Sequence, residues 1–335
     1  MTGSAPIGVD PATLPTVSVV VPIYNSERTI GRLVARISSV LATVARDHEI
    51  VLVDDGSGDG SWRVIESLAR EREGVRGVRL MRNYGQHNAL LAGIRSASCD
   101  VVVTLDDDLQ NPPEEIPKLL DTLAEGYDVV YGDAASRQAS VWRRLATRLT
   151  RWILKNVMAE EAAARASAFR AFRTQMREGF AGYRSGFVSI DVLLSWSTTR
   201  FAAVAVRHDP RELGTSNYTL TKLLVHAIDM FTGFSTLPLR LASIVGFGFT
   251  LFGIALFAWV VGRYLVLGYS VPGFPFLASA IAIFSGAQLF AIGIIGEYLA
   301  RMYVRSMGRP DSVVRSRVGF PPGVAGAARS GGDDA

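Results

Sequence analysis

Two long uncharged stretches near the C-terminus constrain this chain more than any other feature of its sequence. Residues 241–262 form 22 positions without a charge, and residues 276–296 form 21 more. At about 1.5 Å per residue, each stretch can cross roughly 30 Å of hydrocarbon as a helix. A buried helix in a soluble core is the alternative, but two such stretches with charged flanks favour a membrane. The sequence therefore predicts transmembrane helices over 241–267 and 274–300.

The charges beside these stretches predict their orientation. Arg240 precedes the first stretch, and Arg301 and Arg305 follow the second, whereas the connection over 263–275 carries only Arg263. Because basic residues are enriched on the cytoplasmic side of membrane helices, both ends of the chain are expected in the cytoplasm. The predicted location is the inner, or plasma, membrane.

The rest of the chain divides into four segments. Residues 1–15 are polar and broken by prolines, which indicates a flexible leader without a signal peptide. Residues 16–218 are the expected catalytic domain, and residues 219–240 an amphipathic helix that leads into the membrane. Residues 301–335 are expected to form a cytoplasmic tail that is mostly disordered. The net charge of +4, without a basic stripe, favours a membrane surface and not nucleic acid as the partner.

Strand and helix patterns alternate through the first 133 residues. Apolar strands are predicted over 17–24, 48–55, 77–83, 100–108 and 127–133. Helical patterns separate them, over 28–46, 61–72, 86–97 and 113–125. Uniformly apolar strands with helices between them indicate an α/β fold with a mostly parallel sheet covered on both faces. Ligands of such sheets bind beyond the C-terminal strand ends, where Arg82 and Asn83 are among the polar residues.

Three consecutive aspartates end the fourth predicted strand. In the stretch "TLDDDLQNPPEEIP", Asp106 and Asp108 are two residues apart, so their side chains are able to point to the same side. Hard oxygen ligands on a shallow edge suit Mg²⁺ or Mn²⁺, with the remaining ligands supplied by water and a diphosphate. Capping of the following helix is the alternative, and it accounts for one aspartate but not for three.

A second acidic cluster follows the second predicted strand. The sequence "VDDGSGDGS" over 53–61 is a glycine-rich turn, but it lacks the full G-x-G-x-x-G pattern of a dinucleotide site. The carboxylates of Asp54 and Asp55 would repel a pyrophosphate, yet they are able to accept hydrogen bonds from a base or a ribose. We therefore interpret them as nucleoside-binding residues.

Residues 141–156 form a basic amphipathic pattern. Arg144, Arg148, Arg151 and Lys155 recur at helical spacing beside an apolar face. Such a helix is typical of a membrane interface, and a surface helix packed on the sheet is an equal alternative.

Five motifs together resemble a known family. The stretches "VSVVVPIYNSE", "VDDGS", "RNYGQHNALLAG", "TLDDDLQNPPEEIP" and "FSTLPLR", followed by two spans, are similar to family 2 glycosyltransferases that act on polyprenyl phosphates. That group includes dolichol-phosphate mannose synthases, bactoprenol glucosyltransferases and undecaprenyl-phosphate 4-deoxy-4-formamido-L-arabinose transferases. The resemblance implies a Rossmann-like GT-A fold, a nucleotide-diphosphate sugar donor, in particular a UDP-sugar, and a divalent metal. It also allows for a homo-oligomer.

The resemblance also implies roles for single residues. Those that would line the uridine pocket are Pro22, Tyr24, Glu27, Asp54 and Asp55. Asp107 and Asp108 would approach the diphosphate, and Asp106 and Asp108 would form the D-x-D pair that holds the metal. Gln110 would lie near the sugar, and Arg82 and Asn83 complete the donor-binding set. Arg211 and Ser216 would face phosphate groups, for which the arginine fork is well suited.

The chain departs from the family pattern at two places. Asn217 replaces a lysine that usually precedes the tyrosine of the phosphate motif, and Ala164 stands where an acidic residue is common. Glu160 and Glu161 are the nearest carboxylates, so either Glu161 serves as the catalytic base or no base is used. The second alternative is chemically sound, because a phosphate monoester with a second pKa of about 6 is largely a dianion at neutral pH.

The sequence thus predicts an inverting glycosyltransferase that moves a sugar from a UDP-sugar to undecaprenyl phosphate or a similar lipid. A non-catalytic nucleotide-sugar-binding membrane protein on the same fold is one alternative. A processive polysaccharide synthase is another, although it would need a Q-x-x-R-W motif and more spans. The sequence does not identify the transferred sugar; formamido-arabinose, glucose and other deoxy or amino sugars are the alternatives.

Overall fold

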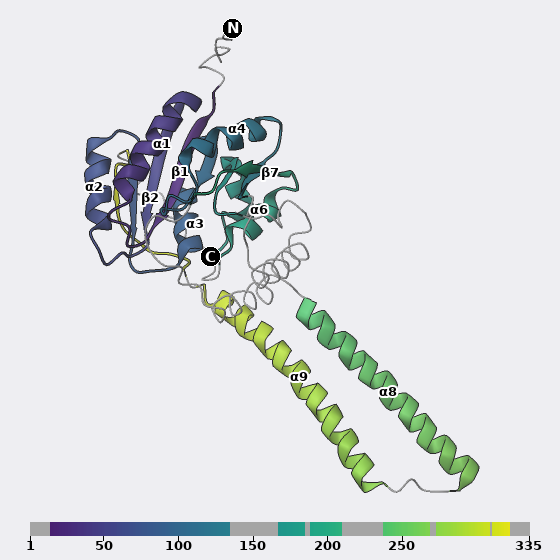
Figure 1. Ribbon diagram of the computed structural model, residues 1–335. Coiled ribbons are helices and arrows are strands. Elements are labelled where there is room, and N and C mark those ends of the chain that lie inside the picture. Colours follow the sequence, from purple (N-terminus) through teal and green to yellow (C-terminus); the bar gives the residue numbers. More distant parts are fainter. Residues whose placement is uncertain are drawn as a thin grey trace, which may run out of the picture. The chain divides into compact units, whose positions relative to one another are not determined.

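The computed structural model describes residues 14–134, 167–184, 188–209, 237–268, 273–308 and 310–321. The chain divides into two compact units. The first combines residues 1–217 with residues 309–335, and the second comprises residues 218–308. The first unit is a sheet covered by helices, and the second contains two long helices (Figure 1).

An eight-stranded sheet forms the centre of the first unit. Its strands are β1 (Thr16–Ile23), β2 (Asp47–Asp54), β3 (Val75–Leu80), β4 (Val101–Thr104), β5 (Val129–Ala134), β6 (Arg170–Arg173), β7 (Phe201–Val206) and β8 (Val314–Val318). Their order across the sheet is β7-β5-β6-β4-β1-β2-β3-β8. The strands β4, β1, β2 and β3 run parallel, as do β5 and β7, whereas β6 and β8 pair antiparallel with their neighbours.

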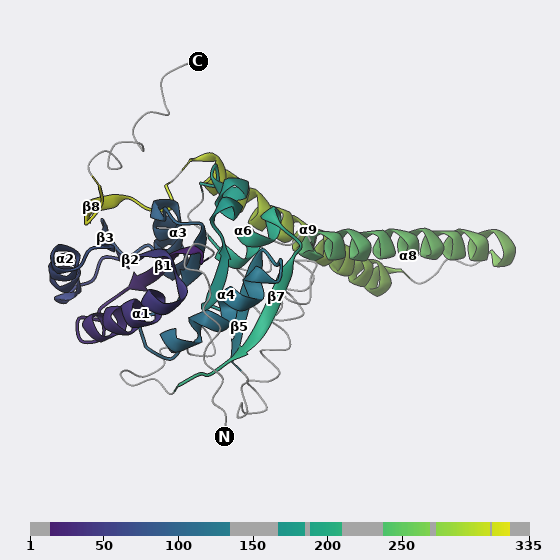
Figure 2. The same cartoon turned by 90° about the horizontal axis from the view of Figure 1, so that it is seen from above.

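Helices cover both faces of this sheet. They are α1 (Ile30–Val44), α2 (Ser61–Glu71), α3 (Gln86–Ser96), α4 (Ile116–Ala124), preceded by the short 3-10 helix η2 (Pro113–Glu115), and α6 (Ile190–Ser197), preceded by η4 (Thr174–Phe180). Apolar residues of α1, α2 and α4 pack in one core cluster, and those of α3, η4 and α6 in another. Figure 2 shows α1 and α3 on opposite sides of the central strands.

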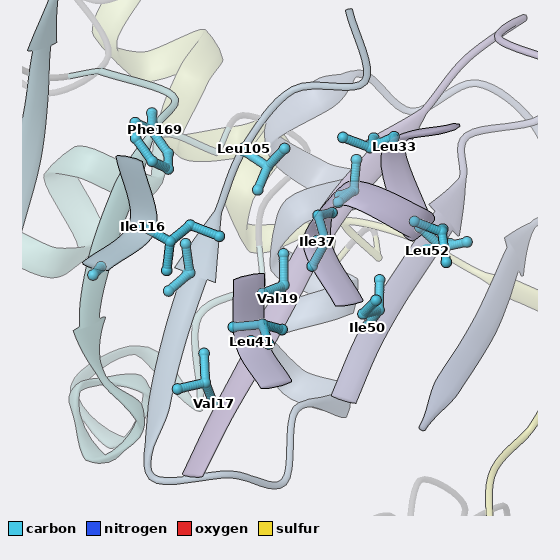
Figure 3. Packing of buried hydrophobic residues seen from close by; sticks show 14 of the residues in the cluster. Val17, Val19, Leu33, Ile37, Leu41, Ile50, Leu52, Leu105, Ile116 and Phe169 are labelled. Carbon is cyan, nitrogen blue, oxygen red and sulfur yellow. The ribbon is translucent and has the colours of Figure 1, made fainter. Parts of the chain in front are cut away.

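The sequence of β1 explains why both faces are covered. Val17, Val19 and Val21 belong to the cluster under α1, whereas Val20 belongs to the cluster under α3. Because successive strand residues point to opposite faces, a continuous run of valines must be buried on both sides. Figure 3 shows Val17 and Val19 against Leu41 and its neighbours on α1. The α/β sheet expected from the sequence is confirmed.

The fourth predicted strand is shorter than expected. It was predicted over 100–108, but β4 ends at Thr104. The chain turns away because the Asp107 carboxylate accepts hydrogen bonds from the loop that follows β1. A further turn follows at Leu109, a buried residue with a φ of 61°. The acidic cluster therefore lies in a loop beyond the strand end.

Residues 310–321, which follow the second long helix, are folded, whereas the sequence predicted a mostly disordered tail over 301–335. Residues 314–318 form β8, which pairs antiparallel with β3. Asp311 forms an ion pair with Arg95 of α3 at 2.7 Å. The sequence "VRSRV" has little apolar content, so its strand conformation depends on pairing with the edge of β3. Residues 322–335 lie outside the described residues.

The second unit contains α8 (Leu237–Leu267) and α9 (Phe274–Ser306). Within them, Leu239–Val266 has a mean hydropathy of 2.3 and Ile283–Val304 one of 1.5, and neither segment is buried in the protein. Both helices are long and apolar enough to cross a membrane. The two predicted spans are thus helical, although each helix extends beyond its predicted range. The predicted amphipathic helix over 141–156 and most of that over 219–240 lie outside the described residues.

Candidate functional site

A cavity of about 240 Å³ lies at the edge of the sheet where β1, β2 and β4 end. Its lining residues come from the end of β1, from the loops that follow β1, β2, β3 and β4, and from the start of α3. They are Pro22, Ile23, Tyr24, Asp55, Asn83, Gly85, Gln86, Asp106, Asp107 and Asp108. Because parallel strands end at one edge, loops that are distant in the sequence meet there. The cavity therefore contains four carboxylates, and this concentration of negative charge favours a cationic ligand.

The Asp107 side chain is bound by protein donors. One of its oxygens, Oδ2, accepts hydrogen bonds from the Ser26 hydroxyl and from the backbone N–H of Tyr24, the latter at 3.3 Å. Burial raises the pKa of this carboxyl, although both hydrogen bonds oppose the shift. Asp107 therefore joins the β4 loop to the β1 loop.

Asp106 and Asp108 make different contacts. Asp106 Oδ1 accepts a hydrogen bond from Gln86 Nε2 at 2.6 Å, and Asp108 Oδ1 accepts one from the backbone N–H of Gln110 at 3.1 Å. No group of three His, Cys, Asp or Glu residues within the described ranges is arranged to hold a metal. A divalent cation bound by Asp106 and Asp108 would therefore need further oxygen ligands from a bound molecule. A diphosphate group supplies such oxygen atoms.

The adjacent Asp54 and Asp55 point to different surroundings. The carboxylate of Asp55 accepts hydrogen bonds from the backbone N–H groups of Tyr84 and Gly85, at 2.7 and 2.8 Å. Burial raises its pKa. Asp54 is fully buried, accepts the backbone N–H of Ser57 at 3.0 Å, and lies 3.3 Å from Arg79 Nε. Asp55 therefore lines the cavity, whereas Asp54 holds the turn and the neighbouring strand in place.

Gly56 allows this turn to pass close to the loop that follows β3. It has a φ of +71°, and a Cβ at this position would lie 2.6 Å from the carbonyl carbon of Arg82. We expect Gly56→Ala to lower the free energy of unfolding by more than about 1–2 kcal/mol, the cost of a left-handed conformation alone. Thermal unfolding measures this loss. Gly31→Ala is the matched control, because a Cβ there meets no atom within 4 Å. A wild-type melting temperature in Gly56→Ala would contradict this assignment.

The remaining predicted donor residues lie around the cavity. Tyr24 is 51% exposed at its rim, and Pro22 and Asn83 are part of its lining. The guanidinium of Arg82 lies over the ring of Tyr84, 4.5 Å from its centroid. Pro22, Tyr24 and Asn83 thus line the cavity, whereas Arg82 lies outside its lining.

Glu27 and Gln110 lie outside the cavity lining. Glu27 Oε2 accepts the backbone N–H of Gly60 at 3.0 Å, at the start of α2. The carbonyl of Gln110 accepts the backbone N–H of Asp209 at 2.8 Å. Glu27 thus connects the loops after β1 and β2, and Gln110 connects the loop after β4 to the segment after β7. Glu161, Arg211 and Ser216, together with Ala164 and Asn217, lie outside the described residues.

The sequence did not predict a role for Gln86 or Ser26, although both contact the aspartate cluster. A polar residue at the first position of a helix that begins at a strand end was the available signal for Gln86. No local pattern distinguished Ser26, because its contact with Asp107 spans 81 positions.

Comparison with known proteins identifies one family, two relatives and one solved structure. Residues 18–180 match the model of glycosyl transferase family 2. The chain is 37% identical over 306 residues to the undecaprenyl-phosphate 4-deoxy-4-formamido-L-arabinose transferase of Yersinia enterocolitica, covering 90% of this chain and 94% of that protein. It is 39% identical over 314 residues to the protein of the same name from Pseudomonas aeruginosa, covering 91% and 92%. A solved structure of Mycobacterium tuberculosis glucosyl-3-phosphoglycerate synthase, in complex with Mn²⁺, UDP and phosphoglyceric acid, has a TM-score of 0.48 and 23% identity, covering 65% of this chain and 76% of that one.

Proposed function

Because this chain belongs to glycosyl transferase family 2, we propose that it transfers a sugar from a nucleotide-diphosphate sugar to a polyprenyl phosphate at a membrane surface. The relatives are glycosyltransferases named for undecaprenyl phosphate, and the similarity covers about nine tenths of the chain. The GT-A class of the α/β fold, expected from the resemblance, is confirmed. The observation that carries the proposal is the combination of an acidic cavity with two exposed apolar helices in one chain.

The cavity fits a donor that brings a divalent cation with its diphosphate. Asp106 and Asp108 supply hard oxygen ligands, which suit Mg²⁺ or Mn²⁺. When bound, the cation would neutralise charge that develops on the departing diphosphate. The exposed ring of Tyr24 and the polar side chain of Asn83 are proposed to contact the nucleoside of the donor. The proposed nucleoside is uridine. Asp55 supports this site by fixing the backbone of Tyr84 and Gly85.

The two long helices are suited to holding the protein where a polyprenyl phosphate presents its headgroup. Residues 310–321 belong to the same unit as the N-terminal sheet, which supports a topology with both ends of the two-helix segment on one side of the membrane. Arg240 and Arg301 flank the apolar segments at these ends and favour the cytoplasmic side. These charges support the proposal that the catalytic unit faces the cytoplasm at the inner membrane.

The proposed reaction is an in-line displacement. The acceptor phosphate is already a dianion near pH 7, so it attacks the anomeric carbon of the sugar without a proton having to be removed. Binding both substrates at one site makes this attack effectively unimolecular. Attack opposite the leaving diphosphate inverts the anomeric centre. Arg211 and Ser216 are proposed to contact phosphate groups, and Glu161 remains the candidate base if one is used.

Release of UDP by the full-length protein in detergent tests this function. The first donor to assay is UDP-4-deoxy-4-formamido-L-arabinose, with UDP-glucose as the contrasting donor, each with and without undecaprenyl phosphate and Mn²⁺. We expect release that requires both the lipid phosphate and the metal, and mass spectrometry would identify the glycosylated lipid. Donor binding without lipid-dependent release from any UDP-sugar would favour the non-catalytic alternative. A growing polymer as the product would instead indicate a processive synthase.

A further inference from the structure

Gln86 contacts Asp106 from outside the aspartate cluster. It is the first residue of α3, it lines the cavity, and its Nε2 lies 2.6 Å from Asp106 Oδ1. An ionised carboxylate only accepts hydrogen bonds, so the amide must present its NH₂ group to Asp106. The contact therefore has a defined direction.

The start of α3 is fixed by contacts on two sides. The Asp55 carboxylate binds the backbone N–H groups of Tyr84 and Gly85 immediately before the helix. Further along, Gly93 lets α3 approach the sheet, because a Cβ there would lie 2.4 Å from Val20. These contacts determine where the first side chain of the helix is held.

The far end of the helix is fixed as well. Arg95 donates hydrogen bonds to Asp311 and to the carbonyl of Tyr183, each at 2.7 Å. A helix held at both ends presents its first residue at a constant position. Gln86 thereby connects this fixed helix to the Asp106 carboxylate in the loop after β4.

We propose that Gln86 is a positioning residue that orients the Asp106 carboxylate for binding the divalent cation. A neutral amide suits this task, because it donates a hydrogen bond without adding a positive charge that would compete with the cation. It also lessens the repulsion among the four carboxylates of the cavity. The inference rests on the proposed function, in which Asp106 and Asp108 hold a metal with the donor diphosphate.

Binding of Mn²⁺ to the full-length protein in detergent tests this proposal. Free Mn²⁺ is measured by electron paramagnetic resonance at saturating UDP, in the wild type and in Gln86→Met, which keeps the length of the side chain and removes the donor. Loss of a hydrogen bond to a metal ligand typically weakens metal binding by about 10–100-fold, and we expect a loss of that size. UDP binding in the presence of EDTA should stay within about twofold, because the amide is assigned to Asp106 and not to the nucleotide.

The control is Gln175→Met, the same change at an exposed position of η4, which should leave Mn²⁺ binding unchanged. The side chain of Gln86 is also exposed, so both variants should melt close to the wild type. Mn²⁺ affinity in Gln86→Met within twofold of the wild type would overturn the proposal. An equal loss of metal-free UDP binding would overturn it too, because Gln86 would then contact the nucleotide. A wild type that binds no Mn²⁺ with UDP would instead refute the metal assignment of the proposed function.

Discussion

Replacing Asp108 with asparagine is expected to lower the rate of sugar transfer on the order of 10³-fold. The change removes one of the two carboxylate charges assigned to the cation, at the point where charge develops on the departing diphosphate. In the wild type, the backbone N–H of Gln110 donates a hydrogen bond to Asp108 Oδ1 at 3.1 Å. The fold should survive the change, because the side-chain oxygen of asparagine is also able to accept this hydrogen bond. UDP release measures the rate, and membrane fractionation measures insertion.

Asp121→Asn is the matched control for this prediction. Asp121 is an exposed residue of α4, so the same loss of charge should leave the rate unchanged. Chelation gives a second test, because EDTA should abolish transfer by the wild type and Mn²⁺ should restore it. Wild-type rates in Asp108→Asn, or full activity in EDTA, would contradict the metal assignment.

Removing the buried carboxylate of Glu49 is expected to lower the free energy of unfolding by about 3–5 kcal/mol. Glu49 is 1% exposed and accepts hydrogen bonds from the Ser18 hydroxyl at 2.5 Å, the backbone N–H of Ser98 at 2.6 Å and the Ser98 hydroxyl at 2.9 Å. It also forms an ion pair with Arg76. In Glu49→Ala these donors lose their shared acceptor, and the penalty for burying them remains.

Thermal unfolding of the detergent-solubilised protein measures this loss. A decrease of this size corresponds to a melting temperature lower by roughly 6–20 °C for a unit of about 240 residues. Glu73→Ala is the control, because Glu73 is exposed and its loss should change stability by less than about 0.5 kcal/mol. A melting temperature within 2 °C of the wild type in Glu49→Ala would show that the cluster contributes little.

The position of the cavity could be predicted from the sequence, but the direction of its side chains could not. Polar residues after β1, β2 and β4 pointed to one edge of a parallel sheet, and residues from all three loops line the cavity. The consecutive Asp106, Asp107 and Asp108 nevertheless have three different partners. Gln86 begins α3 and Ser26 follows β1, so the spacing of the aspartates does not predict either contact, whereas Gln110 belongs to the same loop as Asp108.

The same distinction applies to the acidic pair after β2. The sequence treated Asp54 and Asp55 alike, as nucleoside-binding residues. In the structure Asp55 faces the cavity, whereas Asp54 is fully buried beside Arg79. Successive residues at a strand end point to opposite faces, but which face carries the cavity depends on the neighbouring strands.

The sequence by itself determined the strands and helices of the first half, the two apolar helices and the family. Continuous valine runs, helical periodicity and stretches of more than twenty uncharged residues depend on local composition, and local composition is enough to specify them. Only the tertiary structure decided that residues 314–318 form a strand, that Glu49 binds its donors and that Gln86 reaches Asp106. Each of these features joins segments at least 20 residues apart, and such contacts form only when the sheet brings their partners together.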